Sequence, residues 1–216
     1  MDDSEIVMEN EVIRAIKRRR SVRSYLPNPP PDEYIYAILD AARWAPSAAN
    51  LQPWQFIIVK DENTRRKIQE LVEENRRLTI EVREEPFKTG FSKYSTGWIG
   101  EAPIHIVVCA DPKRTGPHVG GEETYKYGAS AAIQNLMLAA YSLGLGTCWL
   151  TMFNKDRLRE ILGIPQNIDV IGIVTVGYPR EFPEIPETAR RYAMKPRRDL
   201  SEIVFYERYG KTITSQ

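Results

Sequence analysis

The sequence predicts an α+β fold in which helices enclose a single β-sheet. Stretches with apolar residues at helical spacing are interspersed with short apolar runs that are typical of strands. These segments do not alternate regularly, as they would in a βαβ protein, and they do not describe an all-β fold. No repeat, low-complexity block or Gly/Ser linker interrupts the 216 residues. We therefore expect one domain over residues 1–216.

The N-terminal half of the chain predicts three helices and one strand. A first helix is expected over residues 5–19, where apolar residues recur on one side. Prolines end it, and Asp32 is placed to cap a second helix that ends near Ala45–Pro46. A strand over residues 56–59 and a helix over residues 62–83 follow.

Residues 84–101 carry glycines and aromatic residues without clear periodicity. One interpretation is a loop with exposed aromatic side chains that acts as a lid. The alternative is a partly helical excursion on the surface. The sequence favours neither.

The C-terminal half predicts three strands, two helices and an arm. The strands are expected over residues 104–110, 146–150 and 168–176. The helix over residues 124–143 is apolar almost all round, which indicates a large core or a subunit interface. Asn154 is placed to cap the other helix, and residues 180–216 form an arm rich in Pro and Arg.

Composition argues against several classes of function. Thirty basic and 29 acidic residues give a net charge of +1, which offers no electrostatic case for binding nucleic acid or a membrane surface. The acidic N-terminus lacks the order of a signal peptide, and no apolar run approaches the ~20 residues of a membrane span. Cys109 and Cys148 form no disulfide framework, so a cytoplasmic location is expected.

Few residues are suited to acid–base or metal chemistry. The only histidines are His105 in a strand and His118 in a loop, which argues against a His-centred metal site. The chain has no G-x-S-x-G, P-loop or G-x-G-x-x-G pattern. An enzyme with so few candidates is expected to take its reactivity from a cofactor.

Four clusters could bind such a cofactor. Residues 18–24, which we call the basic motif, combine guanidinium groups with a hydroxyl and suit a phosphomonoester. A solvated basic helix end is the alternative. Residues 45–54 form a loop rich in Pro, small residues and amides that could face a planar polar ring, or merely connect a helix to a strand. Trp149–Thr151 end a strand and could be core, and Lys195–Arg198 are again suited to phosphate.

Together these clusters resemble the nitroreductase family of flavoproteins. Arg19–Arg23 is similar to the family's N-terminal FMN motif, and Ala45–Trp54 to its Pro-Ser…Gln-Pro-Trp loop. Gly144–Trp149 resembles the segment that enters the flavin pocket, and Ile171–Pro179 the closing strand. The resemblance implies a three-layer fold with a central mixed or antiparallel sheet surrounded by helices. It also implies an intertwined homodimer with non-covalent FMN at its interface.

The resemblance assigns cofactor contacts residue by residue. Arg20 and Ser21 would hold the phosphate, helped by Arg197 and Arg198. Arg19 and Arg23 would reach the ribityl chain and the N1/O2 edge, where a cation stabilises the negative charge of the reduced ring. The remaining contacts are expected from the loop and the strand end: Pro46, Ser47, Ala48, Asn50, Trp149, Leu150 and Thr151.

The implied reaction is ping-pong hydride transfer from NAD(P)H through FMN to a small acceptor such as a nitroaromatic or quinone. No side chain need act as a catalytic group. Other branches of the family dehalogenate halotyrosines or fragment FMN. The halotyrosine branch uses a lid tyrosine that residues 70–93 lack. A non-catalytic FMN carrier would use the same binding residues, and a nucleic-acid module could use Lys17–Arg20.

Overall fold

The computed structural model describes residues 9–84, 87–92, 95–116, 121–183 and 197–211. The chain forms two units, which are described separately. The larger spans Arg18–Pro183, and the terminal unit combines Met1–Lys17 with Glu184–Gln216.

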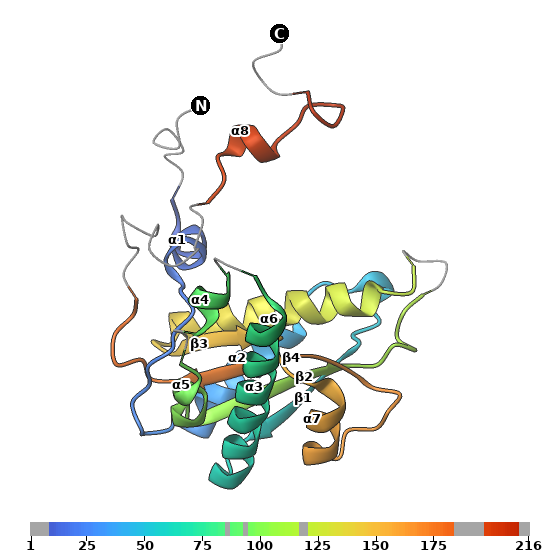
Figure 1. Cartoon of the computed structure of the whole chain (residues 1–216). Helices are drawn as coiled ribbons and strands as arrows, with labels where there is room; N and C mark the ends of the chain where they lie inside the picture. Colours follow the sequence, from blue (N-terminus) through green and yellow to red (C-terminus); the bar gives the residue numbers. More distant parts are fainter. Residues whose placement is uncertain (1–8, 85–86, 93–94, 117–120, 184–196, 212–216) are drawn as a thin grey trace. The chain divides into compact units, whose positions relative to one another are not determined.

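The larger unit is built on a four-stranded sheet with the order β1-β2-β4-β3 (Figure 1). Its strands are β1 (Trp54–Val59), β2 (Ile104–Ala110), β3 (Gly146–Leu150) and β4 (Asp169–Gly177). All three strand pairs are antiparallel. Every residue of β2 is buried, as expected for a central strand that helices cover on both faces.

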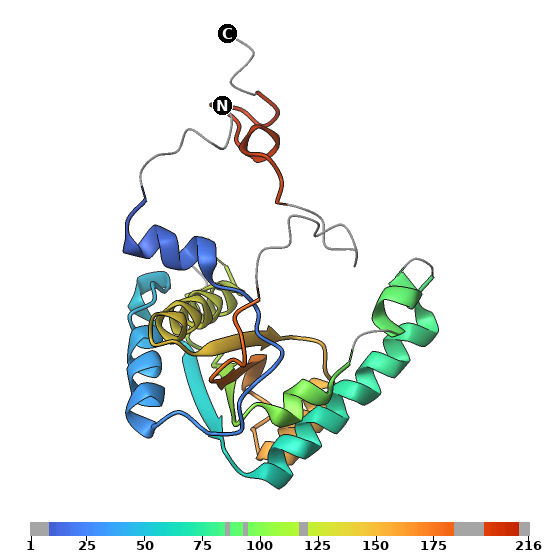
Figure 2. The same cartoon turned by 90° about the vertical axis from the view of Figure 1, so that its left-hand side faces the viewer.

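Helices pack on both faces of this sheet (Figure 2). One face carries α2 (Asp32–Arg43) and α6 (Thr124–Ser142), and the other carries α3 (Glu62–Val82), α5 (Gly97–Glu101) and α7 (Lys155–Leu162). Each interface has its own buried apolar cluster. The predicted α+β class, with one sheet enclosed by helices, is confirmed.

Several predicted elements are also confirmed. The strands over residues 104–110 and 146–150 have the expected bounds. Asn154 caps α7, because its side-chain oxygen accepts from the N–H groups of Asp156 and Arg157 at 3.0 and 3.1 Å.

The predicted cap of the second helix is wrong. Asp32 is the first helical residue of α2, and Pro31 occupies the cap position without a side-chain hydrogen bond. The extended backbone of Pro31, with φ −64° and ψ 154°, sets the start of the helix. The Asp32 carboxylate instead pairs with Lys60.

Within residues 84–101 the described part forms two short helices, α4 (Phe87–Ser92) and α5. This matches the partly helical alternative. Trp98 on α5 is only 6% exposed, so the expectation of exposed aromatic side chains is wrong at this residue. A lid function stays a prediction.

Helix α6 is not covered on every side in the single chain. Nine of its residues are buried, but Tyr127 is 66% exposed and Gln134 is exposed. The exposed positions of this apolar helix could face either a second subunit or solvent.

The terminal unit contains α8 (Leu200–Ile203) and all of α1 (Glu11–Arg18) except its last residue, which belongs to the larger unit. The first helix was expected from residue 5, but residues 9 and 10 are not helical. It begins at Glu11 because the Asn10 side chain accepts from the N–H of Ile13 at 2.9 Å. Residues 1–8 lie outside the described part. None of the described helices has both the length and the apolar character needed to cross a membrane.

Candidate functional site

The basic motif lies along the start of strand β3. The backbone N–H of Val22 donates to the carbonyl oxygen of Thr147 at 2.9 Å, and Ser21 forms a parallel bridge with Thr147. Further on, the N–H of Leu26 donates to Tyr178 O at 2.8 Å. From Arg19 onward the motif is therefore extended chain tied to the sheet, while Arg18 is the exposed last residue of α1.

Close packing explains how the motif approaches β3. The Val22 side chain is fully buried and lies against Gly146. A Cβ at Gly146 would come within 2.7 Å of Val22 Cγ2, so any other residue there would push the motif away. The glycine thus permits the hydrogen bond between neighbouring backbones.

Two buried hydroxyls reinforce this attachment. The Tyr25 hydroxyl donates to Val22 O at 2.9 Å and lies 2.8 Å from Thr175 Oγ1 on β4. Thr175 also lies within 3.3 Å of Cys148 O, to which it can donate. Both hydroxyls are satisfied, which removes the cost of burying them.

Three side chains of the motif lie near the Cys148 thiol. Burial raises the pKa of Cys148, while the positive charges of Arg23 and Arg19 and a hydrogen bond from Ser21 act in the opposite direction. These three side chains therefore lie close enough to Cys148 to influence one thiol. Arg20 Nη1 donates to Arg19 O at 2.7 Å, within the motif itself.

The loop after α2 has a strained backbone. Ala49, Asn50 and Gln52 have positive φ angles of 47°, 55° and 47°. Such conformations cost about 1–3 kcal/mol each and cluster at binding and active sites. The loop is held by Ser47 Oγ, which accepts from Gln52 N at 3.0 Å, and by Arg114, which donates to Leu51 O at 3.1 Å.

The loop and the basic motif lie at opposite ends of α6 (Figure 1). The loop packs at Gly128, where a Cβ would lie 3.2 Å from Ser47 Cβ. The motif lies against Gly146, just beyond the C-terminal end of α6 at Ser142. The 14 helical steps from Gly128 to Ser142 span about 21 Å at the helical rise per residue.

The end of β3 combines core and surface positions. Leu150 is buried in the cluster on the α3 side, as the core interpretation predicted. Thr151 is exposed, and Trp149 is half-buried. The Trp149 indole lies over Gly172, where a Cβ would come within 2.1 Å of Nε1. Its buried Nε1–H has no hydrogen-bond partner among the described residues.

Arg197 and Arg198 belong to the terminal unit, so their contact with a phosphate stays a prediction. Arg198 pairs with Glu202 at 3.1 Å. Lys195 and Pro196 lie outside the described residues. Among those described, no group of three or more His, Cys, Asp or Glu side chains is placed to hold a metal ion.

Comparison with known proteins identifies the family. The model of the Nitroreductase family matches residues 16–178. The chain belongs to the nitroreductase family. Within it, a relative from Archaeoglobus fulgidus, provisionally named NADH dehydrogenase/NAD(P)H nitroreductase, is 36% identical over 84% of this chain and 93% of its own. The iodotyrosine deiodinase of Nematostella vectensis is 32% identical over 84% of this chain and 72% of its own.

Solved structures of the family share the fold. Oxidised iodotyrosine deiodinase bound to FMN and 3-iodo-L-tyrosine superposes with a TM-score of 0.76 at 24% identity, over 92% of this chain and all of that one. A nitroreductase of Desulfovibrio desulfuricans in complex with FMN gives a TM-score of 0.67 at 25% identity, over 94% and 99% of the two chains. The predicted family and its three-layer fold are confirmed.

Proposed function

We propose that this member of the nitroreductase family is a cytoplasmic FMN-dependent oxidoreductase that passes hydride from NAD(P)H to a small acceptor. The observation that carries the proposal is that Ser21 pairs with Thr147 at the start of β3, with Arg19 and Arg23 near enough to act on the neighbouring Cys148 thiol. Related proteins of this family bind FMN in their solved structures.

The chemistry of these donors fits FMN. Guanidinium forks and a hydroxyl match a phosphomonoester, and a further guanidinium matches the electron-rich N1/O2 edge of the ring. We assign Arg20 and Ser21 to the phosphate, with Arg197 and Arg198, and Arg19 and Arg23 to the ribityl chain and ring. When bound, FMN supplies the capacity to accept and release a hydride.

The side chains of this protein would bind and orient FMN and stabilise its reduced form. A guanidinium at the N1/O2 edge favours the reduced cofactor by compensating its negative charge. Thr151 and the half-buried Trp149 would border the face where donor and acceptor bind in turn. No side chain in the proposal acts as a nucleophile or exchanges a proton with the substrate.

The proposed site is shared between two chains. The loop with Ser47, Ala48 and Asn50 lies at the far end of α6 from the basic motif, so the loop of a second copy is better placed to line the same cofactor. Exposed apolar side chains support such a contact, including Tyr36, Trp44 and Tyr127. Obligate dimer interfaces are rich in apolar and aromatic residues.

Reaction kinetics test whether the protein is an enzyme. Steady-state oxidation of NADH or NADPH with a nitroaromatic or a quinone should give the parallel double-reciprocal lines of a ping-pong reaction. A carrier would hold FMN without turnover, and that result would contradict the proposal.

Reductive dehalogenation is the second candidate, supported by the 32% identity to an iodotyrosine deiodinase. The absence of tyrosine from residues 70–93 argues against it. Release of iodide from 3-iodotyrosine by the reduced protein would establish this alternative.

A further inference from the structure

Trp98 and Arg23 are in contact although they belong to different elements. The Arg23 Cζ atom lies 5.8 Å from the centroid of the Trp98 ring. Trp98 is buried and Arg23 is exposed. A cation over an indole face is attracted by the quadrupole of the ring. The ring therefore gives this guanidinium of the basic motif a preferred place.

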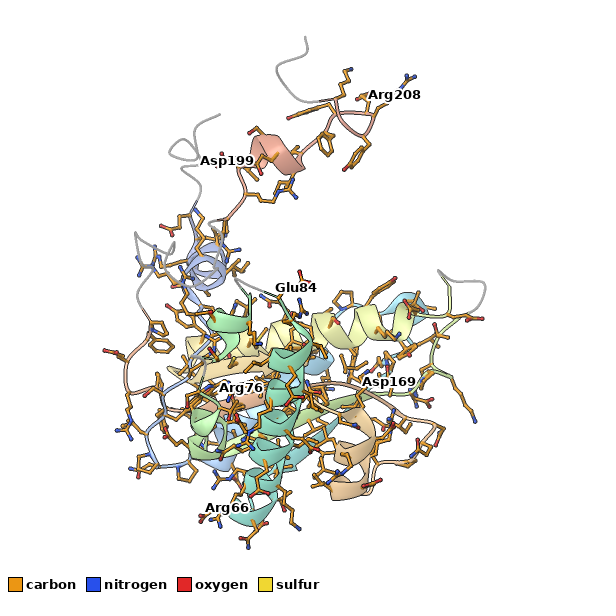
Figure 3. The ribbon with its side chains drawn as sticks, viewed as in Figure 1. Arg66, Arg76, Glu84, Asp169, Asp199 and Arg208 are labelled. Carbon is orange, nitrogen blue, oxygen red and sulfur yellow. The ribbon has the colours of Figure 1, made fainter. Side chains whose placement is uncertain are left out.

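The N-terminal end of α5, which carries Trp98, is fastened to α3. The buried Thr96 hydroxyl donates to Glu73 Oε2 at 2.8 Å. Arg76, labelled in Figure 3, donates to both oxygens of Glu73 at 2.8 and 2.7 Å. Hydrogen bonds to Glu73, of which the one from Arg76 has the largest effect, lower the pKa of this carboxyl group to about 2. It therefore stays charged at neutral pH.

The C-terminal end of α5 is fastened as well. Arg65 Nη1 on α3 donates to Gly100 O at 2.8 Å and to Ala102 O at 2.7 Å. The His105 ring on β2 donates from Nε2 to Ile99 O at 2.7 Å. Side chains from α3 and β2 thus fasten the chain on both sides of Trp98: Glu73 accepts from the Thr96 hydroxyl before it, and Arg65 and His105 donate to carbonyl groups after it. These hydrogen bonds hold the backbone that carries the Trp98 ring in a fixed position.

We infer that Trp98 is a positioning residue for Arg23: its ring holds the guanidinium where the cofactor ring requires a positive charge. The inference rests on the proposed function, because it needs Arg23 beside FMN. It also divides residues 84–101, because α5 would support the site while α4 remains the candidate for a lid.

The test compares the midpoint potential of bound FMN in Trp98→Leu and Trp98→Phe. Loss of the ring should weaken the preference for reduced over oxidised FMN two- to fivefold, the typical strength of an exposed cation–π contact. For a two-electron couple this corresponds to a potential about 10–20 mV lower. Trp98→Phe keeps a ring face and should retain most of the potential. Trp98→Met is the second non-aromatic variant, because a flexible thioether fills irregular space if leucine does not allow folding.

A double-mutant cycle separates positioning from packing. If Trp98 acts through Arg23, Trp98→Leu should not change the potential further in an Arg23→Ala background. A purely structural role would lower the melting temperature of Trp98→Leu and Trp98→Met but leave their potentials at the wild-type value. That result would overturn the inference.

The outcomes also distinguish this inference from the proposed function. If Arg23→Ala lowers the potential and the non-aromatic Trp98 variants do not, only the role of Trp98 fails. If Arg23→Ala leaves the potential unchanged, Arg23 is not at the ring and the inference fails with it, while FMN binding stands. A protein that binds no FMN would contradict the proposed function itself.

Discussion

The backbone N–H of Val22 donates to the carbonyl oxygen of Thr147 at 2.9 Å, and Gly146 makes room for the Val22 side chain beside this bond. The bond attaches the basic motif to the sheet between Ser21 and Arg23. The direction in which both side chains leave the backbone therefore depends on a contact that involves neither of them.

The Gly146→Ala substitution should weaken FMN binding. The new Cβ would lie 2.7 Å from Val22 Cγ2, so the motif must move or the core must strain. Overpacking of this kind costs about 1–3 kcal/mol. Because the strain falls on the motif, FMN titration of the apoprotein should show roughly ten- to a hundredfold weaker binding.

Gly97→Ala is the matched control for this glycine. Its nearest neighbour would be Ser95 Oγ at 3.5 Å, an ordinary contact. FMN affinity should stay at the wild-type level. Equal losses of affinity in both variants would argue against a specific role for the Gly146–Val22 contact.

The Arg23→Ala substitution should lower the midpoint potential of FMN by about 30–65 mV, because a charge-assisted bond worth roughly 1.5–3 kcal/mol is lost from the reduced state. FMN affinity should fall less than in the double variant Arg20→Ala/Ser21→Ala, which lacks phosphate contacts. For each such contact, a ten- to hundredfold loss is expected.

Arg66→Ala provides the control for charge, because this exposed arginine on α3, labelled in Figure 3, pairs with Glu62 one turn earlier in the same helix. In the Arg66→Ala variant, the midpoint potential of bound FMN and the affinity for FMN should match the wild-type values. If Arg23→Ala folds and keeps the wild-type potential, the assignment of Arg23 to the ring is refuted.

A mixed dimer tests the shared site. One chain carries Arg20→Ala/Ser21→Ala and the other carries Ala48→Glu, which places a negative charge in the loop. Each variant alone should bind FMN poorly. If motif and loop come from different chains, the mixed dimer has one intact site and should bind one FMN per two chains. A site built within one chain would leave both sites of the mixed dimer defective.

Stability should fall between pH 7 and pH 5 because of His105. Burial lowers the pKa of His105 from the ordinary 6.5 to about 4. Between these values the unfolded chain binds a proton that the folded chain does not, so the free energy of unfolding decreases as the pH falls. The expected decrease from pH 7 to pH 5 is about 2 kcal/mol.

Urea denaturation of the wild type and His105→Gln at both pH values measures this contribution. Glutamine does not titrate and offers an amide donor for Ile99 O, so its stability should depend less on pH. An identical pH dependence in the two proteins would show that His105 is not responsible.

Several elements were predictable because their signals are local. The strands over residues 104–110 and 146–150 are short apolar runs, and the first is buried throughout. Errors arose where one residue decides a boundary. Asn10 starts α1 through a side-chain hydrogen bond, and Pro31 starts α2 through its extended backbone. The spacing of apolar residues reveals neither feature.

The candidate site was predictable only for residues whose own chemistry suits the cofactor. Arginines and a serine at short spacing stand out in the sequence. Tyr25 and Trp98 were missed because their roles depend on partners brought together by folding. Tyr25 meets Thr175 across 150 positions of the chain, and no nearby pattern indicates that contact.

The absorption spectrum of the purified protein tests the central claim most directly. We expect flavin bands that correspond to about one FMN per chain and that pass into the supernatant when the protein is denatured, since no covalent attachment is proposed. A colourless protein that gains no flavin absorbance after incubation with FMN and gel filtration would contradict the account.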